Sequence, residues 1–237
     1  MIPDTRWVWT ALLGGFATLD ATPVGQTLLS QPLVTATALG WMWGDLETAL
    51  AVGVVLQILA ASTLPIGART PEDYAAGGVA GVAIAIALAR AHPFPMAREG
   101  AQLLGVLAGM VVASLGVPLV KWQRRRNEGL ARWTEAAVRA GDEKALGAAT
   151  YAGVVLAFGI GVTFTAASVA IGVIGLDGLA GRESLRLAHA WGLAEPLWIG
   201  LGIAQMLFAF IQRRLTRAAV FGGSLTVAWI WLVLRTR

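Results

Sequence analysis

Four polar residues interrupt stretches of the sequence that are otherwise apolar. Asp20, Gln26, Gln57 and Asp73 all lie in the first third of the chain, close to several glycines. A carboxylate offers hydrogen-bond acceptors, and an amide offers both acceptors and donors. Small neighbouring residues allow helices to approach closely and also leave room for a ligand. The pattern predicts an enclosed polar pocket for a hydroxyl-rich molecule.

Simpler structural roles compete with this interpretation. Asp20 also fits a helix N-cap in the turn that follows it, and Asp73 fits the N-cap of the helix expected next. Gln57 also fits an amide that joins two helices by a hydrogen bond. Glu195 precedes Pro196, an arrangement typical of a helix start. Both kinds of role remain open from the sequence.

The composition indicates that lipid is the solvent of most of the chain. Hydrophobic residues make up 57% of the 237 residues and charged residues only 14%, whereas soluble domains carry about 25% charged residues. Mean hydropathy is +0.68. The net charge is +4, but no basic groove motif accompanies it, so we expect no nucleic-acid partner. In a membrane protein such basic residues mark cytoplasmic loops and contacts with anionic lipid.

Catalytic and metal-binding signatures are missing from the sequence. There is no cysteine, which excludes a thiolate metal site or a cysteine phosphocarrier. Glycine-rich phosphate loops, HExxH and GxSxG are also absent. The two histidines, His92 and His189, have no partner at metal-ligand spacing. We therefore expect no catalytic residue, no metal and no cofactor in this chain.

Eight apolar stretches predict the helices. They cover residues 7–19, 24–43, 46–64, 74–91, 100–120, 145–176, 187–211 and 218–234. The first is too short to cross about 30 Å of hydrocarbon, and Pro32 must kink or break the second. Broken backbone at membrane depth persists only where protein or a water-filled cavity satisfies it. The sequence thus predicts an all-α integral membrane protein, a multi-span helical bundle with short or re-entrant N-terminal segments.

One long polar segment, residues 121–146, divides the chain. Its arginines and lysines predict a cytoplasmic location by the positive-inside rule, and apolar residues at helical spacing predict an amphipathic helix at the membrane surface. It serves either as a solvated loop that fixes topology or as a docking site for a partner. We treat residues 1–237 as a single membrane domain, with the polar site in 1–120, the basic loop in 121–146 and C-terminal helices in 147–237.

The first third of the chain resembles a known family of sugar permeases. The matching positions are Asp20, Gly25-Gln26, Ser30-Gln31-Pro32-Leu33-Val34, Gly44-Asp45 with Thr48, Gly53 to Gln57, and Ile66-Gly67-Ala68 with Pro71 and Asp73. Their order and spacing over about 55 residues, Thr18 to Asp73, resemble the IIC subunit of the mannose/fructose/sorbose family of phosphotransferase systems. Three features depart from the family pattern. Gln57 stands where the family has a carboxylate, Gln31 stands where it has an arginine, and the turn Pro71-Glu72-Asp73 stands where it has Pro-Pro-Asp.

The resemblance implies a function and a set of partners. A IIC subunit is a multi-pass protein of the bacterial inner membrane that conducts a hexose or amino sugar together with a IID membrane subunit. Cytoplasmic IIA and IIB proteins phosphorylate the sugar, and the paired subunits assemble as trimers. The implied sugar site contains Asp20, Gln26, Gln57 and Asp73, with the backbone of Gly67-Ala68 close to the ligand. The neutral Gln57 also suggests an alternative, a diverged non-transporting relative that acts as a membrane scaffold or sensor for regulatory phosphotransferase proteins.

Overall fold

The N-terminal third forms four short helices. The computed structural model describes residues 4–21, 24–62, 70–211 and 213–235, and its first helices are α1 (Thr5–Ala21), α2 (Pro32–Trp43), α3 (Leu46–Ser62) and α4 (Tyr74–Ala91). At 1.5 Å per residue the 12 residues of α2 extend about 18 Å, well short of the hydrocarbon thickness of about 30 Å. The described residues contain helices and no strands. The expected all-α class with short N-terminal segments is therefore confirmed.

Local sequence explains where α2 begins and ends. Pro32 occupies the first turn of α2, where its missing N–H costs nothing, so the predicted break at this proline is confirmed. Gly44 ends the helix with a left-handed φ of 70°, and the Asp45 N–H donates to the Gly40 carbonyl at 2.9 Å. The Asp45 carboxylate then accepts from the Thr48 N–H at 3.2 Å and caps α3. A tight α2–α3 hairpin results.

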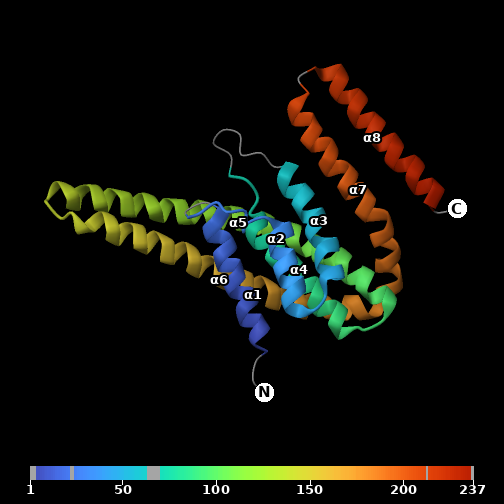
Figure 1. Cartoon of the computed structure of the whole chain (residues 1–237), viewed down its shortest axis with the longest axis horizontal. Coiled ribbons are helices and arrows are strands. Elements are labelled where there is room, and N and C mark those ends of the chain that lie inside the picture. The colour runs from blue at the N-terminus through green and yellow to red at the C-terminus, as the bar shows by residue number, and fades with distance from the viewer. Residues whose placement is uncertain (1–3, 22–23, 63–69, 212, 236–237) are drawn as a thin grey trace.

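Helix α4 lies at the centre of the bundle (Figure 1) and contacts α1, α2, α3, α5 and α6. Its glycines permit the closest of these contacts. A Cβ on Gly81 would lie 2.6 Å from the Gly105 carbonyl oxygen, and one on Gly77 would lie 2.5 Å from the Gly109 carbonyl oxygen. Backbones can approach this closely only where side chains are absent. The pairing of α4 with α5 is therefore encoded by small residues on both helices.

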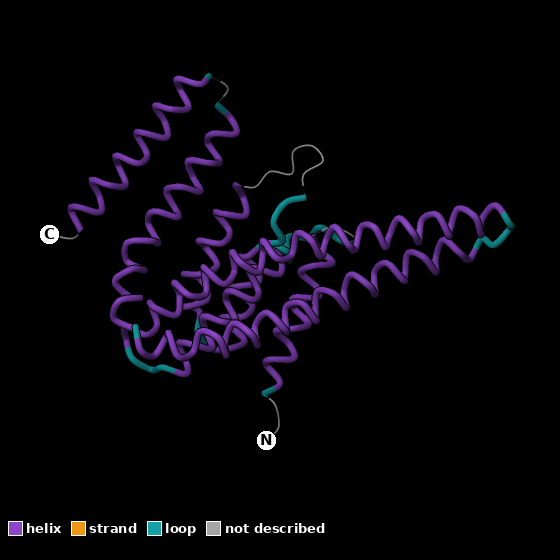
Figure 2. Tube along the Cα trace, turned by 180° about the vertical axis from the view of Figure 1, so that it is seen from behind, coloured by secondary structure: helices purple, strands orange, loops and turns teal. Residues whose placement is uncertain are grey.

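The next two helices are longer than a membrane span. α5 (Pro95–Arg139) has 45 residues and α6 (Lys144–Arg182) has 39, which correspond to about 68 Å and 58 Å. Figures 1 and 2 show them as an antiparallel hairpin whose tip extends well beyond the other helices. The basic segment is helical, but it continues α5 instead of forming a separate surface helix. Pro118 lies inside α5 without ending it, and the chain turns only at Gly141, whose φ is 90°.

The C-terminal helices form a second hairpin that diverges from the bundle (Figure 1). It consists of α7 (Ser184–Phe210) and α8 (Arg214–Arg235), and α8 packs against α7 alone among the described residues. α7 runs through Pro196 without interruption, so the helix start expected at Glu195 does not occur. Within the described residues, four helical segments are long and apolar enough to cross a membrane, namely Tyr74–Ala91, Met96–Arg139, Lys144–Arg182 and Arg214–Arg235.

Candidate functional site

The carboxylate of Asp20 anchors the loop between α1 and α2. Its Oδ1 accepts hydrogen bonds from the Thr27 backbone N–H and from the Thr27 hydroxyl at 2.8 Å, and its Oδ2 accepts from the Ser30 N–H at 2.8 Å. Asp20 is only 5% exposed. The three donors therefore compensate the carboxylate for the water contacts that it loses on burial. The loop contains residues in the left-handed region, including Gln26 with φ 53°. Asp20 thus fixes an otherwise unfavourable loop conformation.

Gln57 connects α3 to the start of α2. Its Nε2 donates to the Gln31 Oε1 at 2.6 Å, and its Oε1 accepts from the Leu33 N–H at 3.2 Å. Two of the positions that depart from the family pattern, Gln31 and Gln57, are therefore in direct contact with each other. A neutral amide pair occupies the place where the resemblance implies an arginine and a carboxylate.

A cavity of about 300 Å³ opens beside this pair. Its volume is at the lower end of the range typical of small-molecule sites. It is lined by the ends of α1 to α4, the segment before α4 and the middle of α5, with these residues at its wall: Thr18, Ala21, Ser30, Gln31, Pro32, Ala60, Ala61, Thr70, Pro71, Glu72, Asp73, Tyr74, Ala75, Val120, Gln123 and Arg124. Carboxylates, amides, hydroxyls and a guanidinium thus surround one space.

Asp73 lines the cavity and also caps α4. Its Oδ1 accepts from the Ala76 N–H at 3.2 Å, while its own N–H donates to the Ala113 carbonyl at 2.9 Å. A Cβ on Gly116 would lie 2.5 Å from the Asp73 Cβ, so α5 approaches here only because residue 116 is glycine. Burial raises the pKa of the Asp73 carboxyl, and the Ala76 N–H acts in the opposite direction. The predicted N-cap is confirmed.

The other predicted site residues stand in different relations to the cavity. Asp20 and Gln57 do not line the cavity themselves. Asp20 accepts a hydrogen bond from Ser30, and Gln57 donates one to Gln31; Ser30 and Gln31 both line the wall. Gln26 is exposed in the α1–α2 loop and is not among the lining residues. Gly67 and Ala68 lie outside the described residues.

Sequence reasoning missed the contribution of α5 to the cavity. Gln123 and Arg124 reach it from the segment that was expected to lie separately at the membrane surface, and the Arg124 Nη1 donates to the Thr70 hydroxyl at 3.4 Å. The sequence signal that could have found these residues is a helix that continues from the apolar stretch into the basic segment. Val120, Gln123 and Arg124 are spaced three and four residues apart, so a helix that continues past Pro118 places them on one face.

The described walls of the cavity carry hydrogen-bonding groups suited to binding a polar ligand. Its polar groups can donate to and accept from several hydroxyls of one ligand. Among the described lining residues, no nucleophile is paired with a histidine base. Across the part of the chain that the structure describes, no three His, Cys, Asp or Glu side chains are grouped so as to hold a metal.

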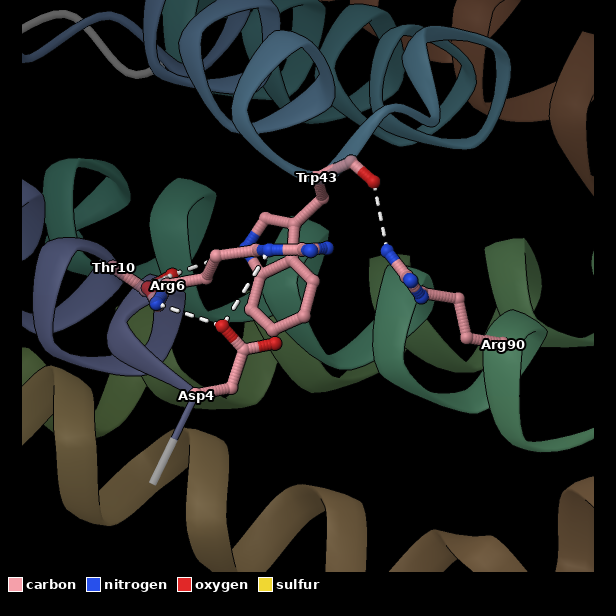
Figure 3. Close-up of polar contacts among 5 residues, drawn as sticks. All are labelled: Asp4, Arg6, Thr10, Trp43 and Arg90. Carbon is pink, nitrogen blue, oxygen red and sulfur yellow. Dashed lines mark hydrogen bonds and ion pairs between the residues drawn. The ribbon is translucent and has the colours of Figure 1, made fainter. Parts of the chain in front are cut away.

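A second polar cluster fastens the opposite end of α2 (Figure 3). The Trp43 indole donates from Nε1 to the Thr10 hydroxyl at 3.2 Å, and Arg90 donates to the Trp43 carbonyl at 2.7 Å. The guanidinium groups of Arg6 and Arg90 each lie 5.5 Å from the centre of the Trp43 ring, within the range of cation–π attraction. This cluster ties α1, α2 and α4 together away from the cavity. Its role is structural: it fixes the C-terminal end of α2, whereas the N-terminal end of α2 lines the cavity.

Comparisons with known proteins agree with this architecture. A solved structure described as a membrane protein superposes with a TM-score of 0.69 and 17% identity, covering 98% of this chain and 97% of the other. This likeness shows the fold alone. A search of curated proteins found no match.

The family itself is shown by a sequence model. The model for the sorbose-specific IIC component of the phosphotransferase system matches residues 6–228, which is nearly the whole chain. The match includes all of α7 and the first two thirds of α8, where no motif was recognised. With four candidate spans, the protein is a multi-pass membrane component of a sugar phosphotransferase system. The chain belongs to the sorbose-type IIC family, the permease subunits of these systems.

Proposed function

We propose that this chain conducts a hexose or an amino sugar across the bacterial inner membrane through the cavity beside Gln31 and Asp73. The observation that supports the proposal is the convergence of polar side chains from distant parts of the sequence on one space of about 300 Å³. Hydroxyl-rich ligands need such paired donors and acceptors, because each buried hydroxyl left unsatisfied costs free energy.

Phosphorylation of the sugar requires separate proteins. The cavity offers no phosphocarrier residue, since neither histidine nor cysteine lines it. Cytoplasmic IIA and IIB proteins supply the phosphoryl group, and a IID membrane subunit completes the permease, in an assembly of paired subunits arranged as a trimer. These partners are inferred from the family of this chain.

The charges in the cavity favour amino sugars over acidic sugars. Glu72 and Asp73 contribute two carboxyl groups, and Arg124 contributes one guanidinium. The Gln31–Gln57 pair adds hydrogen-bonding capacity without charge. An ammonium group on the sugar complements the carboxyl groups, whereas a sugar acid meets them unfavourably.

The test is uptake and phosphorylation of labelled hexoses and hexosamines by cells that contain the matching IIA, IIB and IID proteins. Asp73→Asn and Arg124→Ala should lower uptake at least tenfold. The matched control is Arg125→Ala, since Arg125 is the exposed neighbour of Arg124 and does not line the cavity. Thermal unfolding of the purified variants separates loss of binding from loss of the fold.

The same experiment decides the scaffold or sensor alternative, which is favoured by the neutral pair at Gln31 and Gln57. A scaffold retains the phosphocarrier proteins at the membrane but binds none of the sugars when purified with IID. Equal uptake by wild type, Asp73→Asn and Arg124→Ala would remove the cavity from the transport path.

A further inference from the structure

A second mixed-charge groove lies far along the chain from the first cavity. It has a volume of about 400 Å³ and is formed by the start of α5, the first half of α7 and the end of α8. Glu99, His189, Glu195 and Arg235 supply its polar groups, and Leu193 and Trp231 are among its apolar wall. The proposed sugar pathway uses none of these residues.

The groove lies near the ends of membrane-spanning segments, which places it at the membrane interface. Glu99 directly precedes the apolar stretch 100–120 of α5, and Trp231 and Arg235 are in the last two turns of the candidate span Arg214–Arg235. The ends of membrane-spanning helices lie at the level of the lipid headgroups, where tryptophan and arginine are enriched. The groove is also at the end of α5 opposite to the basic segment 121–139. Two span ends therefore meet at one headgroup-level hollow.

The charges of the groove are of both signs. The carboxylates of Glu99 and Glu195 and the guanidinium of Arg235 line the same hollow. The Arg235 guanidinium lies 4.9 Å from the centre of the Trp231 ring, so cation–π attraction holds it against the groove wall. A matching ligand has an ammonium that donates to carboxylates and an anionic group that accepts from the guanidinium.

The surrounding surface favours a ligand with acyl chains. α8 leaves large apolar side chains exposed along its length, among them Val227 at 68% and Ile230 at 52%. Both precede the groove residue Trp231 on the same candidate span. A soluble zwitterion would leave this apolar approach unused, whereas a phospholipid places its tails along it and its headgroup in the groove.

We propose that this groove binds the headgroup of an aminophospholipid, with the primary ammonium at Glu99 and Glu195 and the phosphate at Arg235. A quaternary choline ammonium has no N–H to donate to the carboxylates. A glycerol headgroup lacks the cation altogether and brings a net negative charge towards two carboxylates. The order of affinity is therefore ethanolamine above choline, and choline above glycerol headgroups.

The test is lipid binding by the full chain in detergent, followed by native mass spectrometry and by the shift of the thermal-unfolding midpoint. Phosphatidylethanolamine, phosphatidylcholine and phosphatidylglycerol with identical acyl chains are the probes. We expect phosphatidylethanolamine to bind at least tenfold more tightly than the other two. Equal binding of ethanolamine and choline lipids would overturn the proposal.

Variants locate the lipid. Glu99→Gln combined with Glu195→Gln should remove the preference for ethanolamine, and Arg235→Gln should weaken all three phospholipids at least tenfold. Glu128→Gln and Arg214→Gln are matched controls, because they remove the same charges on α5 and α8 at positions outside the groove. If the double variant does not fold, the exposed Glu99→Gln and Arg235→Gln carry the test separately. An unchanged preference in the variants that fold would contradict the assignment.

Discussion

Helices α4 and α8 are equally apolar but have opposite surroundings. Their most apolar windows have the same mean hydropathy, yet 78% of the α4 window is buried inside the protein and 0% of the α8 window is. Both helices also contain glycine pairs, Gly77-Gly78 in α4 and Gly222-Gly223 in α8. A Cβ on either α4 glycine meets atoms within about 3 Å, whereas a Cβ on either α8 glycine meets nothing within 4 Å. Hydropathy therefore identifies a helix that avoids water, but only complementary small residues on a neighbour decide whether protein covers it.

The largest expected effect comes from adding volume to α4. Gly81→Leu places a side chain against the Gly105 carbonyl, which is backbone and cannot yield, so we expect the free energy of unfolding to fall by more than about 3 kcal/mol. Gly223→Leu in α8 is the matched control and should change it by less than about 0.5 kcal/mol. Thermal unfolding in detergent, followed by tryptophan fluorescence, measures both. Similar losses in the two variants would show that α8 is also packed against protein.

The next effect concerns the loop that places Pro32 against α4. A Cβ on Gly78 would lie 3.0 Å from the Pro32 Cβ, and the loop before Pro32 depends on Asp20. Asp20→Ala leaves the Thr27 and Ser30 backbone donors without their acceptor and should lower the free energy of unfolding by about 2–3 kcal/mol. Asp142→Ala, in the exposed turn after α5, should have little effect. A loss under about 0.5 kcal/mol in Asp20→Ala would mean that other contacts hold the loop.

A smaller effect tests the amide pair that faces the cavity. Gln31→Arg and Gln57→Glu should be coupled, because the guanidinium and the carboxylate replace one neutral contact with a charge-assisted one. We expect the double variant to be about 1–2 kcal/mol more stable than the sum of the single changes. Gln31→Arg combined with Thr150→Glu, an exposed position on α6, should be additive. Additivity in the first pair would argue that Gln31 and Gln57 separate in solution.

The smallest effect changes sign between the two regions. Gly222→Ala in α8 should raise the free energy of unfolding by about 0.5 kcal/mol, because alanine loses less backbone entropy in a helix. Gly109→Ala in α5 should lower it instead, because a Cβ there would lie 2.9 Å from the Gly77 carbonyl oxygen. The same thermal-unfolding measurement detects both. An increase in both variants would contradict close packing of α4 on α5.

Several features of the fold and site were accessible from local sequence. Pro32, Gly44 and Asp73 act through their own backbone geometry or through hydrogen bonds to residues a turn away, so their roles do not require knowledge of distant contacts. The prediction of a helix start at Glu195 was wrong, because the effect of a proline in a membrane helix depends on its neighbours and not on local sequence alone. Pro196 is tolerated inside α7, as prolines are in membrane helices when neighbouring groups compensate for the lost hydrogen bond.

The make-up of the cavity was accessible only in part. Asp73 was predicted and lines the wall, but Arg124 and Gln123 were missed because their segment was expected at the membrane surface and not as a continuation of α5. The contact between Gln57 and Gln31 joins residues 26 positions apart. The sequence pattern of neither helix predicts this contact, because the contact depends on how α2 and α3 pack against each other.

By itself, the sequence determined that the chain is a helical membrane protein and that it resembles a IIC permease. These features follow from hydropathy, proline and glycine, whose effects extend over only a few residues. The tertiary structure alone decided which apolar helix is covered, which polar residues share a cavity and that two Gln substitutions meet in one contact. The reason is physical. Apolar helices look alike to a hydropathy average, whereas packing depends on the shape of a partner surface many residues away.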